Sequence, residues 1–251
     1  MDALAYLLSG LASGLFSGGL GQGGAAVATP LLRLLGLSPH VALGTPVPMI
    51  LPGAVTGALT YLRAGMVDRA AVVRVAPAFA ATTYFGALLT RRVDGSLLML
   101  ACAAILLFLA IRLLPSQSPP APDGASTRHA AALPLLGAGV GLLAGLLGVG
   151  GGFLMVPAFI HWFRMPTKTA LGTSLAVIAL TVAINAAGQN QAGNIDWVVA
   201  LLLTVGVVPG ARLGALLAIR APERRLRIVM AVALSGLAVV YAFSELTKLG
   251  A

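Results

Sequence analysis

Long uncharged stretches dominate the chain, and two of them exceed the length of a single membrane helix. Residues 3–32 and 130–160 contain no Asp, Glu, Lys or Arg. A helix rises about 1.5 Å per residue, so roughly 20 residues cross the apolar interior of a bilayer. Each of these stretches must therefore tilt strongly or break.

Glycine clusters indicate where the two stretches break. Residues 18–24 read GGLGQGG and residues 145–152 read GLLGVGGG. Glycine is unfavourable within a helix and readily adopts positive φ. We therefore predict two units in which a helix, a break and a second helix follow one another. Three further spans are expected after each unit, at 41–62, 70–89 and 97–114 in the first half and at 169–189, 197–219 and 228–244 in the second.

A polar, proline-rich segment separates these two sets of spans. Residues 115–128 read PSQSPPAPDGASTR and lack hydrophobic periodicity, as is typical of an exposed linker. We predict a first transmembrane repeat at 1–114, a cytoplasmic linker at 115–129 and a second transmembrane repeat at 130–251. The expected fold class is an all-α polytopic membrane protein with two homologous halves.

The two halves are copies of one pattern. An offset of 127 carries Gly10, Gly14, Gly18, Gly21, Gly23, Gly24 and Pro30 onto Gly137, Gly141, Gly145, Gly148, Gly150, Gly151 and Pro157. An offset of 128 carries residues 42–45 (ALGT) onto 170–173 (ALGT), and Gly65, Asp68 and Gly86 onto Gly193, Asp196 and Gly214. The early glycines recur every four residues, which predicts close helix packing. Asp68 and Asp196 are expected to cap the helices that follow them.

The distribution of Lys and Arg favours inverted halves. Basic residues accumulate in cytoplasmic loops. With an odd number of crossings per half, one side holds Arg63, Arg69, Arg74, Arg112, Arg128, Arg164, Lys168, Arg220, Arg224, Arg225 and Arg227, and the other holds Arg33, Arg91, Arg92 and Lys248. We expect both termini outside the membrane and the linker on its cytoplasmic side. Ten crossings, or six crossings plus two re-entrant hairpins, both satisfy this parity.

Composition narrows the class of protein. The chain is 59% apolar and 9% charged, with a net charge of +9, whereas roughly a quarter of residues are charged in soluble domains. We attribute the positive excess to membrane orientation. We therefore expect the chain to contact a lipid bilayer and not nucleic acid.

The glycine breaks are candidate binding segments. A discontinuous membrane helix leaves backbone N–H groups unpaired, and its positive N-terminal end can face an anion. We predict a substrate-lining role for Gly21, Gln22, Gly23, Gly24, Gly148, Gly150, Gly151 and Gly152. The alternative is a purely packed kink.

Several polar side chains extend this candidate site. The hydroxyls of Thr45, Thr173 and Ser174 could cap helices or donate to an oxyanion, and we favour the second role. Asn185 either bonds a neighbouring helix or faces a wet pathway. Arg212 either snorkels to the interface or serves as a fixed cation for the substrate, and both interpretations stay open.

Acidic residues are placed outside the expected pore. All seven, Asp2, Asp68, Asp94, Asp123, Asp196, Glu223 and Glu245, lie at predicted span ends or in loops. A pore without carboxylates suits an anion and argues against a buried acid as proton relay. Sodium coupling, a proton carried on the substrate and uncoupled flow remain open, and neither a catalytic residue, a metal site nor a cofactor is expected.

The duplicated motifs resemble those of one transporter family. The pattern G-x-x-G-x-G-G with a Pro six residues later, then A-L-G-T-[SP] and G-x-[VI]-D, is similar to the sulfite exporter TauE/SafE family. The resemblance implies an inner-membrane carrier of sulfite, thiosulfate or organosulfonates. Pro46 and Ala25 depart from the second copy, which has Ser174 and Gly152. The expected function is alternating-access transport of a small anion, with an anion channel or, at lower rank, a membrane-embedded enzyme as alternatives; a homo-oligomer is left open.

Overall fold

The computed structural model describes residues 2–113, 132–148 and 150–249, and the predicted linker at 115–129 lies outside them. The described residues form helices and no strands, which confirms the all-α class. The first half comprises α1 (Asp2–Leu20), α2 (Ala25–Leu34), α3 (Pro39–Gly44), α4 (Val47–Arg63), α5 (Arg69–Leu89), the short 3-10 helix η1 (Thr90–Arg92) and α6 (Gly95–Leu113). The second comprises α7 (Leu133–Leu147), α8 (Gly152–His161), α9 (Thr167–Gln191), α10 (Trp197–Arg220) and α11 (Glu223–Leu249).

Six helical segments of the described chain are long and apolar enough to cross a membrane, which makes this a multi-pass membrane protein. They are Ala3–Leu20, Pro39–Arg63, Arg69–Arg92, Thr167–Gln191, Trp197–Arg220 and Glu223–Phe243. The expected span at 41–62 is divided into α3 and α4, because the prolines at 46 and 48 cannot supply backbone donors. The last span begins earlier than expected, since α11 includes the basic residues that follow Glu223.

Both helix breaks occur at the predicted glycines. Gly21, Gly23 and Gly24 have φ of 70°, 80° and 84°, and Gly148, Gly150 and Gly151 have φ of 64°, 79° and 72°. Positive φ ends a right-handed helix, and glycine adopts it without steric cost. The helices that follow, α2 and α8, have 10 residues each. At about 1.5 Å per residue neither can cross a bilayer alone, so the number of crossings stays a prediction.

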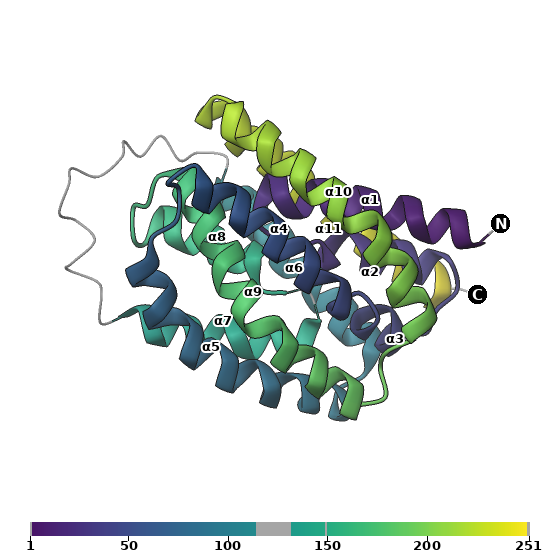
Figure 1. The fold of residues 1–251 in the computed structure, drawn as a ribbon. Helices are drawn as coiled ribbons and strands as arrows, with labels where there is room; N and C mark the ends of the chain where they lie inside the picture. Colours follow the sequence, from purple (N-terminus) through teal and green to yellow (C-terminus); the bar gives the residue numbers. More distant parts are fainter. Residues whose placement is uncertain (1, 114–131, 149, 250–251) are drawn as a thin grey trace.

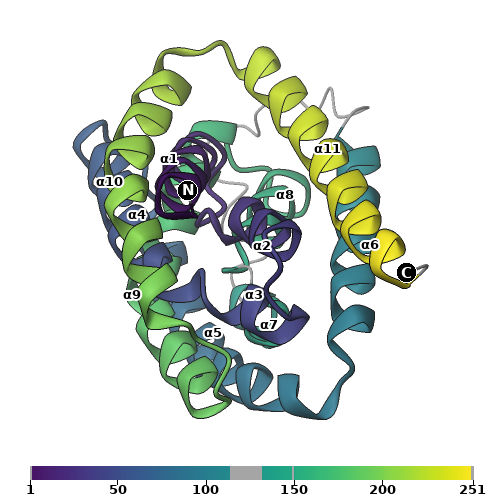
Figure 2. The same ribbon diagram turned by 90° about the vertical axis from the view of Figure 1, so that its right-hand side faces the viewer.

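The helices of the two broken units, together with α3, lie inside the bundle. Figure 2 shows α1, α2, α3, α7 and α8 between a wall of α4, α5, α9 and α10 and a second wall of α6 and α11. In agreement with this position, every residue from 21 to 30 is buried, as are residues 150–153. The glycine breaks are thus held in the protein interior (Figure 1).

Equivalent helices of the two halves make equivalent contacts. Helix α1 packs along α10 in a parallel course, with Gly10, Gly14 and Gly18 against Leu203, Val207 and Ala211 in turn. Helix α7 packs along α5 in the same way, with Gly137, Gly141 and Gly145 against Val75, Phe79 and Thr83. The packing role predicted for these glycines is confirmed, because a Cβ at each would meet the backbone of the partner helix.

The two central helices α4 and α9 run antiparallel. Near the start of α4, Gly44 of α3 lies against Asn194, which follows α9; at the other end, Tyr61 of α4 lies against Gly172 of α9. Equivalent helices that run in opposite directions agree with the expectation of inverted halves. The inversion with respect to a membrane, and the side on which the termini lie, stay predictions.

The glycine contacts between α1 and α10 predict a strong and position-specific sensitivity to side chains. We expect Gly14→Ala to destabilise the protein by about 1–3 kcal/mol, because the new Cβ would press on Val207 O and approach Ala211 N to 2.9 Å. Thermal unfolding in detergent measures the change. Gly139→Ala is the matched control, since nothing lies within 4 Å of its added Cβ, and it should leave the melting temperature unchanged or raise it. Equal losses in both variants would contradict the packing role.

Candidate functional site

The two glycine breaks touch each other at the centre of the fold. Gly152 lies on the backbone of the first break, where a Cβ would press on Gly21 O and come 2.6 Å from the Cα of Gln22. A Cβ on Gly150 would lie 3.4 Å from Gln22 O. A side chain at position 152 would therefore force the two breaks apart.

Two equivalent isoleucines border this junction. A Cβ on Gly23 would lie 3.0 Å from Cγ2 of Ile50 and 3.7 Å from Cγ2 of Ile178, and a Cβ on Gly150 would lie 3.1 Å from Cδ1 of Ile50. Ile50 belongs to α4 and Ile178 to α9, at positions related by the offset of 128. Both are fully buried. The central antiparallel helices thus present matching apolar side chains to the breaks.

The second helix of each broken unit begins at this junction without a side-chain cap. Gly24 and Gly151 are the N-cap residues of α2 and α8, both in the left-handed region, and neither helix has an acidic residue in its first turn. The first N–H groups of a helix lack intrahelical partners and carry its positive dipole end. The junction therefore concentrates backbone donors and partial positive charge in the protein interior.

Helix carbonyls freed by the breaks receive equivalent donors in the two halves. Tyr61 Oη donates to Gly18 O at 3.1 Å, and Gln189 Nε2 donates to Gly145 O at 2.8 Å. These donors are related by the offset of 128 and their acceptors by 127. Gln189 also accepts a hydrogen bond from Asn194 at 2.8 Å. Both polar atoms of its amide are thus hydrogen-bonded within the fold.

The predicted hydroxyl residues join the halves. Thr45 Oγ1 accepts a hydrogen bond from the N–H of Asp196 at 3.0 Å, and Thr173 Oγ1 accepts one from the N–H of Asp68 at 2.9 Å. Ser174 Oγ donates to Gly21 O at 3.0 Å. Each threonine still has its hydroxyl hydrogen to donate, whereas the serine has used its own on the first break.

Four acidic residues of the described chain lie at the starts of helices and not in the breaks. Asp68 and Asp196 accept from backbone N–H groups at the starts of α5 and α10, which confirms them as helix caps. Asp94 accepts from the N–H groups of Ser96 and Leu97. Glu223 lies 3.6 Å from Arg227 in the same helix.

Some buried polar atoms have no hydrogen-bond partner within the described part of the chain. Gln22 is 1% exposed, and both its Oε1 and its Nε2 lack a partner. Asn185 is equally buried and its Oδ1 is unpaired; it lies two turns after Ile178 on the same face of α9. The sequence analysis names both as candidate site residues, and both have unused hydrogen-bonding capacity.

Sequence reasoning missed further hydroxyls near the first break. Ser13 and Ser17 in α1 are buried, and their Oγ atoms are unpaired among the described residues. A Cβ on Gly24 would lie 3.3 Å from Cβ of Ser17, so these serines adjoin the start of α2. Their spacing of four residues places them on one helix face, which is the signal that could have identified them.

Arg212 does not join this group. Its neighbours Ala211 and Gly214 pack on α1, while Arg212 itself is on the exposed side of α10. This placement favours snorkelling towards the membrane surface. A substrate role for Arg212 stays a prediction.

Comparison with known proteins gives a consistent result. The model of the family described as sulfite exporter TauE/SafE matches residues 6–241. A probable membrane transporter protein of Xylella fastidiosa (strain 9a5c) is 31% identical over 219 residues, covering 85% of this chain and 82% of that protein. The probable membrane transporter protein YjnA of Bacillus subtilis is 28% identical, covering 95% of this chain and 100% of that protein. No solved structure gives a significant match.

The hydrogen bond from Tyr61 should measurably stabilise the first break. We expect Tyr61→Phe to lower the free energy of unfolding by about 1–3 kcal/mol, because Gly18 O loses its donor in a buried position. Thermal unfolding of the purified protein provides the measurement. Tyr84→Phe removes the exposed hydrogen bond to Gln191 and should have a smaller effect. If both variants unfold at the same temperature, the bond to Gly18 does not hold the break.

Proposed function

We propose, since this chain belongs to the sulfite exporter TauE/SafE family of membrane transporters, that it carries a small sulfur-containing anion across the inner membrane by alternating access. Sulfite, thiosulfate and organosulfonates are the candidate substrates, and the family description itself refers to sulfite export. The relatives are named as probable membrane transporters, which favours transport over enzymatic activity.

One observation carries this proposal: the two glycine breaks touch each other, an uncapped helix N-terminus follows each of them, and the amide of Gln22 in the first break is unpaired. An oxyanion needs several hydrogen-bond donors and gains from positive dipole ends. The junction supplies backbone N–H groups from α2 and α8, and the Gln22 Nε2 adds a side-chain donor. The carboxylates of Asp68, Asp94, Asp196 and Glu223 lie at the starts of helices and are engaged there by backbone N–H groups or a basic side chain, and none of them belongs to a glycine break.

The burial of the junction supports a carrier over an open channel. Residues 21–24 and 150–152 are buried by protein, and Ile50 and Ile178 cover them from α4 and α9. A substrate could reach this position only after the helices separate on one side. We assign this arrangement to a state that is closed towards both membrane faces. The coupling ion is left to the flux measurement, with sodium, a proton on the substrate or no coupling as the candidates.

A flux experiment tests the activity. Purified protein in liposomes should show saturable uptake of sulfite, thiosulfate or a short sulfonate such as taurine, and unlabelled substrate inside should accelerate uptake by exchange. Protein that is folded but moves none of these anions under proton, sodium or anion gradients would contradict the proposal. Single-channel conductance without saturable exchange would favour the channel.

Gln22 provides the sharpest test of the site. We expect Gln22→Met to reduce substrate affinity or turnover about tenfold or more, because one charge-assisted hydrogen bond is lost. The same variant should fold at least as stably as the original protein, since it removes a buried polar group that has no partner here.

Gln189→Met is the matched control for this variant. Its amide bonds Gly145 O and Asn194, so the substitution should lower stability as a partnered buried group is removed. If Gln22→Met keeps full transport while losing stability, the side chain is a structural element and not a substrate ligand.

A further inference from the structure

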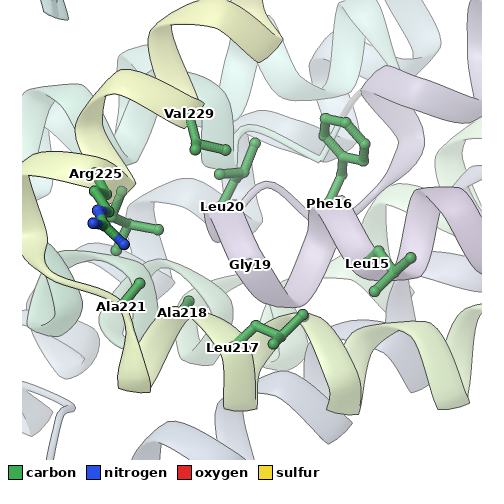
Figure 3. Close-up of a pocket in the computed structure, with 11 residues that line it drawn as sticks. Leu15, Phe16, Gly19, Leu20, Leu217, Ala218, Ala221, Arg225 and Val229 are labelled. Atoms are coloured by element: carbon green, nitrogen blue, oxygen red, sulfur yellow. The ribbon is translucent and has the colours of Figure 1, made fainter.

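An apolar groove opens between α1, α10 and α11, at the end of α1 that leads into the first break. Its volume is about 260 Å³, and its walls include Phe16, Gly19, Leu20, Leu217 and Val229. Figure 3 shows these side chains around a hollow, with Arg225 at one end. All three helices include segments long and apolar enough to span a membrane, so the groove lies along helices expected to be in the bilayer.

Gly19 keeps this groove open. A Cβ at Gly19 would meet only Gly214, at 3.6 Å from its O, which is ordinary contact. The neighbouring Gly18, in contrast, is pressed on the backbone of Ala211. Close packing therefore requires glycine at position 18 but not at position 19, where a missing side chain leaves space.

The second half of the chain offers an internal comparison. The offset of 127 places Leu146 at the position equivalent to Gly19, and the offset of 128 places Leu97 at the position equivalent to Arg225. The features that open the groove and charge its end are thus confined to the first broken unit and α11. They are not a by-product of the repeated fold.

The charge at the end of the groove suits an anionic headgroup. Arg225 is exposed in the first turn of α11; Arg224 precedes it and Arg220 ends α10. The acid of this turn, Glu223, is engaged by Arg227 at 3.6 Å and by Thr167 at 3.3 Å. Within the described ranges Arg225 forms no hydrogen bond or ion pair, so its guanidinium can donate hydrogen bonds to phosphate oxygens.

We propose that this groove binds one anionic phospholipid of the surrounding membrane, with an acyl chain along the apolar walls and the phosphate at Arg225. Basic sites between membrane helices hold lipid headgroups in this way, and apolar walls hold the chain. The site adjoins Gly21, because Leu20 is the last residue of α1. A bound acyl chain would thus rest against α11 and the end of α1 beside the first break.

Native mass spectrometry of the protein in a neutral detergent tests the proposal. Phosphatidylglycerol should remain bound as one molecule per chain and raise the melting temperature more than phosphatidylethanolamine does. Arg225→Gln should weaken phosphatidylglycerol binding about fivefold, the contribution of one basic residue near a membrane surface. Gly19→Leu should reduce it further by filling the groove. Arg224→Gln removes the same charge from a residue that does not line the groove and should keep the binding.

Each alternative result overturns the proposal. Binding that Arg225→Gln and Gly19→Leu leave unchanged would place the lipid elsewhere. A dimer that Gly19→Leu dissociates, without selective lipid retention, would make the groove an interface between copies of the chain. If Gly19→Leu does not fold, Ala221→Leu is the substitute variant, because Ala221 directly follows α10 and also lines the groove. The measurement uses no transport substrate, so its outcome is independent of the proposed activity.

Discussion

The contact between Gly152 and the backbone of Gly21 and Gln22 is the constraint on which this fold depends. It requires that two helices stop in the interior, that both breaks be narrow, and that no side chain stand between them. Positive φ at three glycines in each break satisfies the first requirement. The remaining helices enclose the junction, since irregular backbone is tolerated within a membrane protein only when protein or a wet cavity surrounds it.

Duplication gives the fold its framework, and differences between the copies give it individual properties. Tyr61 and Gln189 occupy equivalent positions and donate to equivalent glycine carbonyls with different chemistry. Ser174 donates to Gly21 O, whereas its equivalent, Pro46, has no hydroxyl. The hydrogen bonds at Thr45 and Thr173 are, in contrast, preserved in both halves. The bonds between halves therefore follow the repeat, while the immediate surroundings of the breaks do not.

The sequence predicted the framework well because glycine and charge carry strong local signals. Clustered glycines located both breaks, and uncharged runs located the long helices. The sequence could not show that Gln189 caps α7 while Gln22 stays unpaired, because both are buried glutamines whose difference arises from tertiary contacts. It also left Arg212 with two interpretations, since a helix face is assigned only when its packing partner is known. The groove beside Gly19 escaped notice for the same reason: Gly19 follows the packing residue Gly18 in sequence, and only the structure shows that it borders open space.

The unpaired amide of Gln22 lowers the stability of the fold, and a simple helix kink would not require it. A buried polar group without a partner costs about 1–3 kcal/mol, and the second copy manages its break with Val149 in the equivalent sequence position. Valine at that position shows that a break of this sequence type does not require an amide. The amide thus destabilises the closed arrangement relative to any state in which it finds a partner. Under the proposed function, a substrate oxyanion would supply such a partner, and its binding would relieve the cost and shift the equilibrium between states. The unpaired amide would thereby give the substrate different affinities for the two conformations, and a carrier needs such a difference in order to couple binding to movement.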